Sequence, residues 1–126
     1  MENKENEMPV IHIEDLYRIY KSGQEKVRAL NGVSFDIMRG QFVAIVGTSG
    51  SGKSTLLNMM AGLEKPSRGK IVIAGKHIEK LNEGQLVRFR RQHVGFIFQS
   101  YNLMPSMNAI ENVALPLSFR GIDRKI

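Results

Sequence analysis

Residues 47–55 read Gly-Thr-Ser-Gly-Ser-Gly-Lys-Ser-Thr, and this stretch decides the fold. It fits the pattern G-x-x-x-x-G-K-[ST], whose glycines allow positive φ angles, so that successive backbone N–H groups can surround an anion. Lys53 adds a mobile positive charge for the β- and γ-phosphates of a nucleotide, and in this pattern the Ser54 hydroxyl is a Mg²⁺ ligand. The predicted phosphate-binding residues are Gly47, Thr48, Ser49, Gly50, Ser51, Gly52, Lys53, Ser54 and Thr55.

The residues on either side of this loop predict a strand before it and a helix after it. Phe42 to Val46 is an unbroken apolar run, as expected for a strand buried on both faces of a parallel sheet. Ser54 to Ala61 is compatible with a helix, and Gly62 follows as its stop signal. A flexible Gly/Ser linker, the alternative, would have polar flanks and no lysine at this place. The order of strand, glycine loop and helix therefore predicts an α/β fold of the P-loop NTPase type.

The residues before the loop predict antiparallel strands. A strand is expected from Val10 toward Tyr20, a turn at Lys21–Gln24, and a returning strand at Val27–Leu30. Asn31-Gly32 is a type I′ hairpin signal, and residues 33–37 alternate between apolar and polar side chains.

The residues after the loop predict two more strands and two more helices. Strands are expected at Lys70–Ala74 and Val94–Phe98, and a helix from Asn82 to about Gln92. Asn108 begins the capping pattern of the last helix. The predicted core residues of the first of these helices are Leu86 and Phe89.

Composition limits the classes of partner. The 126 residues carry a formal net charge of +6, which favours anionic partners such as nucleotides or an acidic lipid surface. Nucleic acid is not expected, because the basic residues are dispersed apart from Arg88, Arg90 and Arg91, and no aromatic-rich RNA-binding box accompanies them. Cysteine is absent, which excludes a disulfide framework and a thiolate metal site, and the three histidines lack metal-ligand spacing. Residues 1–8 are expected to be a disordered tail.

Three segments resemble the first half of the ATP-binding domain of ABC transporters. They are SGSGKSTLLNMMAGLEKPSRG (49–69), VGFIFQSYNLMP (94–105) and ENVALPL (111–117). The chain is most similar to the branch that serves lipoprotein release, macrolide and peptide export, and cell division. This resemblance implies a partial ABC ATPase core in residues 9–126, with an N-terminal antiparallel β part and the start of the helical subdomain.

The resemblance also implies roles for residues outside the loop. Tyr20 matches the aromatic residue that stacks on adenine, although Tyr17 competes for this role and Tyr20 could instead pack within the hairpin. Gln99 matches the glutamine that ligates Mg²⁺ and senses the γ-phosphate; the alternative is a surface loop glutamine. Lys53 and Gln99 are thus the predicted catalytic residues, and Ser54 and Gln99 the predicted metal ligands.

The partners implied by the resemblance are ATP with Mg²⁺, a transmembrane permease subunit, and a second ATP-binding subunit with which the protein dimerises. Tyr101 to Pro105 and the following helix match the region that docks on the permease, although Leu103 and Met104 are also candidates for core residues. The protein is then expected to be cytoplasmic and peripheral on the inner face of the cell membrane.

Two segments that an ABC ATPase needs do not occur in these residues. They are the apolar strand ending in Asp-Glu, which activates water, and the Leu-Ser-Gly-Gly-Gln segment, which caps the partner subunit's nucleotide. We therefore expect a domain truncated before both segments. A non-hydrolysing nucleotide-binding remnant is the alternative function. A third candidate is another P-loop enzyme. A GTPase is disfavoured because the sequence has no Asn-Lys-x-Asp guanine reader, and a small-molecule kinase because its lid is not expected to supply FIFQSYNLMP.

The purified 126-residue chain is expected to bind ATP weakly or not at all on its own, and to hydrolyse it negligibly. Hydrolysis should be negligible because the sequence supplies neither a water-activating carboxylate nor the segment that caps the nucleotide of a partner subunit. Phosphate release from Mg-ATP by material of verified mass measures this. Robust turnover that Lys53→Ala abolishes would show the expectation to be wrong.

Overall fold

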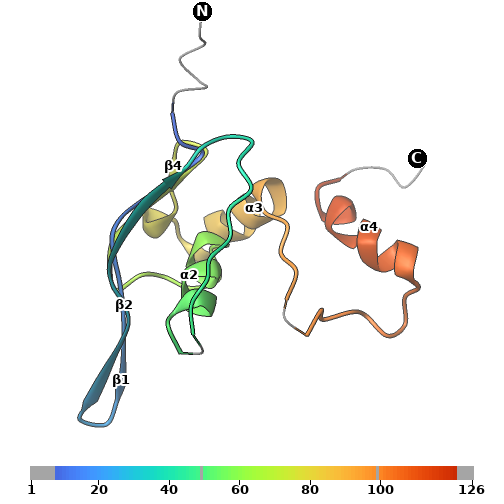
Figure 1. Cartoon of the computed structure of the whole chain (residues 1–126). Helices are drawn as coiled ribbons and strands as arrows, with labels where there is room; N and C mark the ends of the chain where they lie inside the picture. Colours follow the sequence, from blue (N-terminus) through green and yellow to red (C-terminus); the bar gives the residue numbers. More distant parts are fainter. Residues whose placement is uncertain (1–7, 49, 99, 122–126) are drawn as a thin grey trace, which may run out of the picture. The chain divides into compact units, whose positions relative to one another are not determined.

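A computed structural model describes residues 8–48, 50–98 and 100–121 (Figure 1). Most of the predicted tail, together with Ser49 and Gln99, lies outside the described residues. The chain divides into two units, residues 1–82 and residues 83–126. The first unit carries a sheet and a helix, and the second carries two helices.

The sheet of the first unit is antiparallel and has the strand order β2-β1-β3-β4. Its strands are β1 (Ile11–Ser22), β2 (Glu25–Ile37), β3 (Arg68–Ile73) and β4 (Lys76–His77). Alternating apolar side chains of these strands turn inward, toward a core that also includes side chains of the helix α2. The buried core residues of this unit are Ile13, Leu16, Leu30, Leu56, Met59, Ala61, Ile71, Ile73 and Ile78.

The long β1–β2 hairpin confirms the predicted turn near Gly23 but not the one at Asn31-Gly32. β2 continues through Asn31 and Gly32 without reversing, because β1 is long enough to pair with it along its whole length. Gly32 has φ +78° and lies where the register between β1 and β2 shifts. The dipeptide therefore forms an irregularity within a strand, and a Cβ at Gly32 would lie 3.0 Å from the Tyr17 hydroxyl.

The helix α2 (Lys53–Met60) follows the glycine loop, as predicted. Ala61 caps its end, Gly62 N donates to the carbonyl of Met59 at 3.0 Å, and Leu63 N donates to the carbonyl of Asn58 at 2.8 Å. This pair of hydrogen bonds is a Schellman motif and confirms Gly62 as the stop. The short 3₁₀ helix η1 (Ile78–Lys80) completes the unit.

The second unit contains α3 (Glu83–His93) and α4 (Ala109–Phe119). Leu86 and Phe89 of α3 are buried, as predicted. Asn108 caps α4, because its side-chain oxygen accepts a hydrogen bond from Glu111 N at 2.8 Å. No residue of α4 is buried, although most of its side chains are apolar.

Two apolar runs predicted as strands, the first of them as a strand of a parallel sheet, do not form strands. Phe42–Val46 and Val94–Phe98 have no regular secondary structure; Phe42 is 99% exposed and Ile97 84% exposed. A strand is stabilised by hydrogen bonds to neighbouring strands, and in the part of the chain that the structure describes neither run has such a neighbour. The prediction of strands at Phe42–Val46 and Val94–Phe98 was therefore wrong.

The glycine loop is seated directly on the sheet at Gly52. This residue has φ +92°, and a Cβ built on it would lie 2.3 Å from the carbonyl oxygen of Ala29 in β2. It would also lie 3.2 Å from a methyl group of Leu30. Only glycine satisfies both the backbone angle and this approach, so the start of α2 is fixed against β2.

Replacing Gly52 with alanine should destabilise the first unit by about 2 kcal/mol or more, because backbone strain and a collision with a carbonyl add together. Gly40→Ala is the matched control: Gly40 also has a positive φ, +81°, but a Cβ there would meet nothing within 4 Å. The control should cost only about 1 kcal/mol. Urea unfolding followed by circular dichroism compares them, and equal losses would contradict the packing of Gly52 on Ala29.

The two exposed apolar runs should cause association at concentrations of tens of micromolar. Their backbone N–H and C=O groups can pair with another chain, and their apolar side chains favour that contact. The double variant Phe42→Ser, Ile97→Ser should reduce light scattering and change the free energy of unfolding by less than about 0.5 kcal/mol. Val27→Ser is the control, since Val27 is also exposed but belongs to a paired strand. Scattering that falls equally in the control would count against these runs as the cause.

Candidate phosphate-binding site

The glycine loop curls back on itself before α2 begins. Gly50 and Gly52 both have positive φ angles, +80° and +92°, and Ser51 N donates to the carbonyl of Thr48 at 3.1 Å. A Cβ on Gly47 would lie 2.6 Å from the Ser51 hydroxyl oxygen, so the first residue of the loop lies close to its middle. Backbone that alternates in this way forms the concave array of N–H groups that binds anions.

The start of α2 leaves donors available to a ligand. Gly52 is its N-cap and has no side chain, and no acidic residue lies in the first turn. The first N–H groups of a helix have no partner inside the helix, and the helix dipole gives this end a partial positive charge. The N-terminus of α2 therefore favours an anion at the loop.

Lys53 is directed toward the loop. Its ammonium group donates a hydrogen bond to the carbonyl of Gly47, at the opposite end of the loop. The loop and the first turn of α2 thus supply backbone donors, one ammonium group and the hydroxyl-bearing residues Ser51, Ser54 and Thr55, and no acidic residue lies in that turn. This set of donors fits a polyphosphate, and a serine hydroxyl is an oxygen ligand of the kind that Mg²⁺ takes.

Tyr20 lies in the same unit as the loop. It pairs with Val27 across the hairpin, and two residues further along β2 Ala29 contacts Gly52. Tyr20 is 37% exposed, and its hydroxyl donates to a carboxylate oxygen of Glu64. Tyr17, the competing tyrosine, is less exposed and lies against Gly32.

Two residues beside Tyr20 were not identified from the sequence. The guanidinium of Arg18 lies over the Tyr20 ring, 4.7 Å from its centroid, and Arg18 Nε is 3.0 Å from Glu64 Oε1. Residues two apart on a strand share a face, so the spacing of Arg18 and Tyr20 was a usable signal. No sequence signal linked Glu64 to β1, because their contact depends on the tertiary fold.

The predicted docking segment is exposed. Tyr101 is 69% and Leu103 65% exposed, and Met104 is exposed as well, so the alternative that Leu103 and Met104 are core residues is wrong. Asn112 of α4 ties the segment to the helix. Its side-chain oxygen accepts from Met104 N at 2.8 Å, and its amide nitrogen donates to the carbonyl of Met107 at 3.1 Å.

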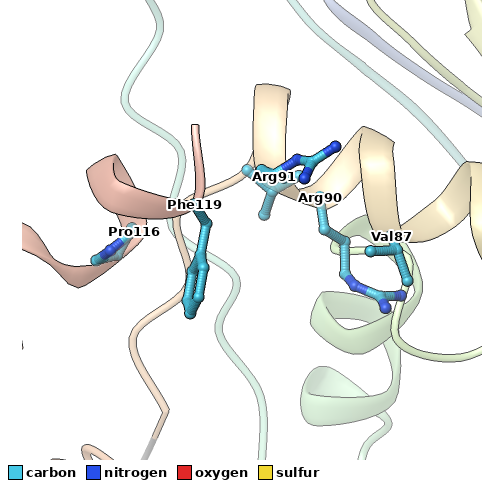
Figure 2. Close-up of a pocket in the computed structure, with 6 residues that line it drawn as sticks. Val87, Arg90, Arg91, Pro116 and Phe119 are labelled. Atoms are coloured by element: carbon cyan, nitrogen blue, oxygen red, sulfur yellow. The ribbon is translucent and has the colours of Figure 1, made fainter. Parts of the chain in front are cut away.

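A pocket of about 390 Å³ lies within the second unit (Figure 2). Val87, Arg90 and Arg91 of α3 line it, and Pro116 and Phe119 come from α4, with Val94 completing the lining. Apolar side chains make up most of this lining, so the pocket suits an apolar group better than a phosphate. Among the described residues, no helix is both long and apolar enough to cross a membrane.

The sequence profile of the ABC transporter family matches residues 30–125. The chain is 44% identical over 116 residues to an uncharacterized ABC transporter ATP-binding protein of Thermotoga maritima, covering 92% of this chain and 50% of that protein. It is 47% identical to the lipoprotein-releasing system ATP-binding protein LolD of Coxiella burnetii, with the same coverage. It is 48% identical to the macrolide export ATP-binding/permease protein MacB of Hyphomonas neptunium, covering 90% of this chain and 18% of that protein.

Solved structures agree with these relatives. The dimeric structure of MJ0796, a bacterial ABC transporter cassette, has a TM-score of 0.85 and 40% identity, covering 92% of this chain and 50% of that one. A post-hydrolysis state of MJ0796 bound to ADP and Pi gives a TM-score of 0.83, also at 40% identity, covering 92% of this chain and 49% of that one. The chain thus spans about half the length of the cassette and of the separate ATP-binding proteins that it matches. The likeness confirms the predicted fold class, a partial P-loop ABC ATPase core. This chain belongs to the ABC transporter family.

Proposed function

We propose that the chain is the N-terminal part of the ATP-binding subunit of an ABC transporter of the export or lipoprotein-release type. In such a subunit, ATP binding and hydrolysis drive the movement of a membrane partner. The observation that carries the proposal is that Lys53 reaches back to the Gly47 carbonyl across the glycine loop, at a start of α2 that no side chain caps. The names of LolD and MacB, which describe ATP-binding proteins of release and export systems, support the same reading.

Within this proposal the residues of the loop have different roles in binding the phosphates and Mg²⁺. The amides between Gly47 and Thr55 hold the phosphate oxygens, and Lys53 leaves the Gly47 carbonyl to pair with the β- and γ-phosphates. Ser54 and Gln99 are the proposed Mg²⁺ ligands. When bound, Mg²⁺ neutralises charge on the phosphates. Gln99 lies outside the described residues, so its role rests on the resemblance alone.

The base of the nucleotide is proposed to stack on Tyr20. Its exposed ring lies in the same unit as the loop, beside the part of β2 on which Gly52 is seated. Stacking on an aromatic ring contributes ~1–3 kcal/mol, which complements a loop that contacts only phosphates.

The membrane partner is proposed to dock on Tyr101–Pro105 and α4. This surface exposes apolar side chains, including Ile110 at 80% and Val113 at 79%, and exposed apolar surface marks interfaces. The apolar pocket beside Phe119 offers a place for a partner side chain. The same proposal includes a second ATP-binding subunit and a position at the inner face of the membrane.

Nucleotide binding is tested by titrating the ¹⁵N-labelled chain with ATP to millimolar concentration and following its amide NMR signals. The largest shifts are expected between residues 47 and 55. Lys53→Ala should raise the dissociation constant about 10- to 100-fold, because a charge-assisted hydrogen bond to phosphate is lost.

The control for net charge is Lys76→Ala, which removes the same charge from an exposed position on β4. It should change the dissociation constant by less than about twofold. Shifts confined to other residues, or an affinity that Lys53→Ala leaves unaltered, would refute the proposed function.

A further inference from the structure

We infer that Arg18 and Glu64 hold the Tyr20 ring in place for a nucleotide base, with Arg18 covering one face and leaving the other for the base. Arg18 and Glu64 are then positioning residues that determine how strongly the base adds to phosphate binding. The inference rests on the proposed function, because it takes the loop at Gly47–Thr55 as the site of the phosphates.

One carboxylate oxygen joins the three side chains. Glu64 Oε1 accepts from Arg18 Nε at 3.0 Å and also from the Tyr20 hydroxyl. The Arg18 guanidinium lies over the Tyr20 ring at 4.7 Å from the centroid, within the range of a cation–π interaction. The ring is thus held at its hydroxyl end and on one face.

Backbone contacts keep this cluster in place. Arg18 Nη1 donates to the carbonyl of Lys65 at 3.1 Å. Ile19 N donates to the Ser67 hydroxyl at 3.0 Å, and Ser67 N donates to the carbonyl of Tyr17 at 2.8 Å. The segment after α2 is therefore fastened along β1, which brings Glu64 beside two residues of that strand.

Partial burial makes these interactions effective. The side chains of Arg18 and Glu64 are 28% and 21% exposed, so water screens the ion pair less than it would on an open surface. Tyr20 remains 37% exposed with its hydroxyl engaged and one face covered by Arg18, and we assign the opposite face to the base. A ring that is ordered before the ligand arrives loses less conformational freedom on binding, which raises affinity.

The same helix connects the two ends of the site. α2 begins at Lys53, beside the phosphate loop, and its Schellman motif ends just before Glu64. If the phosphates of a ligand bind at the start of α2, the other end of the ligand can contact the Tyr20 ring, which Glu64 holds from the segment after α2. This arrangement fits a nucleoside triphosphate rather than inorganic polyphosphate.

The test separates the contribution of the base to the binding affinity from the contribution of the phosphates. The dissociation constants of inorganic triphosphate and of ATP are measured by NMR titration of the full chain, and their ratio reports the contribution of the base. The ratio should exceed about 5 in the original chain and fall to near 1 in Tyr20→Ala. Arg18→Ala should lower the ratio about 3- to 10-fold and leave triphosphate binding within about twofold. Arg18→Lys should give an intermediate ratio, because lysine keeps the charge without the planar group.

The chain provides a matched control. The Arg68 guanidinium lies over the Tyr17 ring, also at 4.7 Å, so Arg68→Ala removes the same kind of contact from a neighbouring tyrosine of the same strand. This variant should leave the ratio unchanged. If Arg68→Ala lowers the ratio as much as Arg18→Ala does, the inference is overturned, because the base would then stack on Tyr17.

A ratio that Arg18→Ala leaves unchanged, while Lys53→Ala still weakens triphosphate binding, overturns the inference and keeps the proposed function. Triphosphate binding that Lys53→Ala leaves unaltered overturns the proposed function itself. If Arg18→Ala does not fold, Glu64→Gln replaces it, since the amide oxygen can still accept from Tyr20 but lacks the charge that pairs with Arg18. A fall of about 2- to 5-fold in the ratio is then expected, and an unchanged ratio overturns the inference.

Discussion

The approach of Gly52 to the carbonyl of Ala29 is the contact on which the rest of the site depends. It sets where α2 begins relative to β2, and through that the direction of the first N–H groups of the helix. Because the loop ends at this residue, the position of Lys53 follows from it. A side chain at Gly52 would push the helix away from the sheet and separate the phosphate donors from Tyr20, which the same hairpin carries.

Features decided by local interactions were predictable from the sequence. The glycine loop, the stop of α2 at Gly62 and the cap of α4 at Asn108 each depend on residues within a few positions of one another. The hairpin turn near Gly23 and the core residues Leu86 and Phe89 were also found, since turn residues and helical periodicity are short-range signals. The residues that form the sequence pattern are the same residues whose hydrogen bonds and backbone angles stabilise these features.

Features that depend on distant partners were not predictable. Asn31-Gly32 has the composition of a hairpin turn, but pairing along the whole of β1 overrides that local preference. Phe42–Val46 has the composition of a core strand, yet composition does not provide a neighbouring strand. Leu103 and Met104 are exposed although they are apolar, and hydrophobicity alone does not separate a core side chain from an exposed one.

The same distinction explains why a loop motif identifies phosphate more readily than base. Backbone amides and one lysine, all within nine consecutive residues, suffice to bind a polyphosphate, so the motif carries its own chemistry. Holding a ring for a base requires a carboxylate 44 residues away in sequence from Tyr20 and 46 away from Arg18. That contact exists only after the segment following α2 has been fastened to β1 through Ser67. In the function that we propose, discrimination between a nucleotide and a bare polyphosphate is thus a property of the folded unit, while the groups that would bind phosphate lie close together in the sequence.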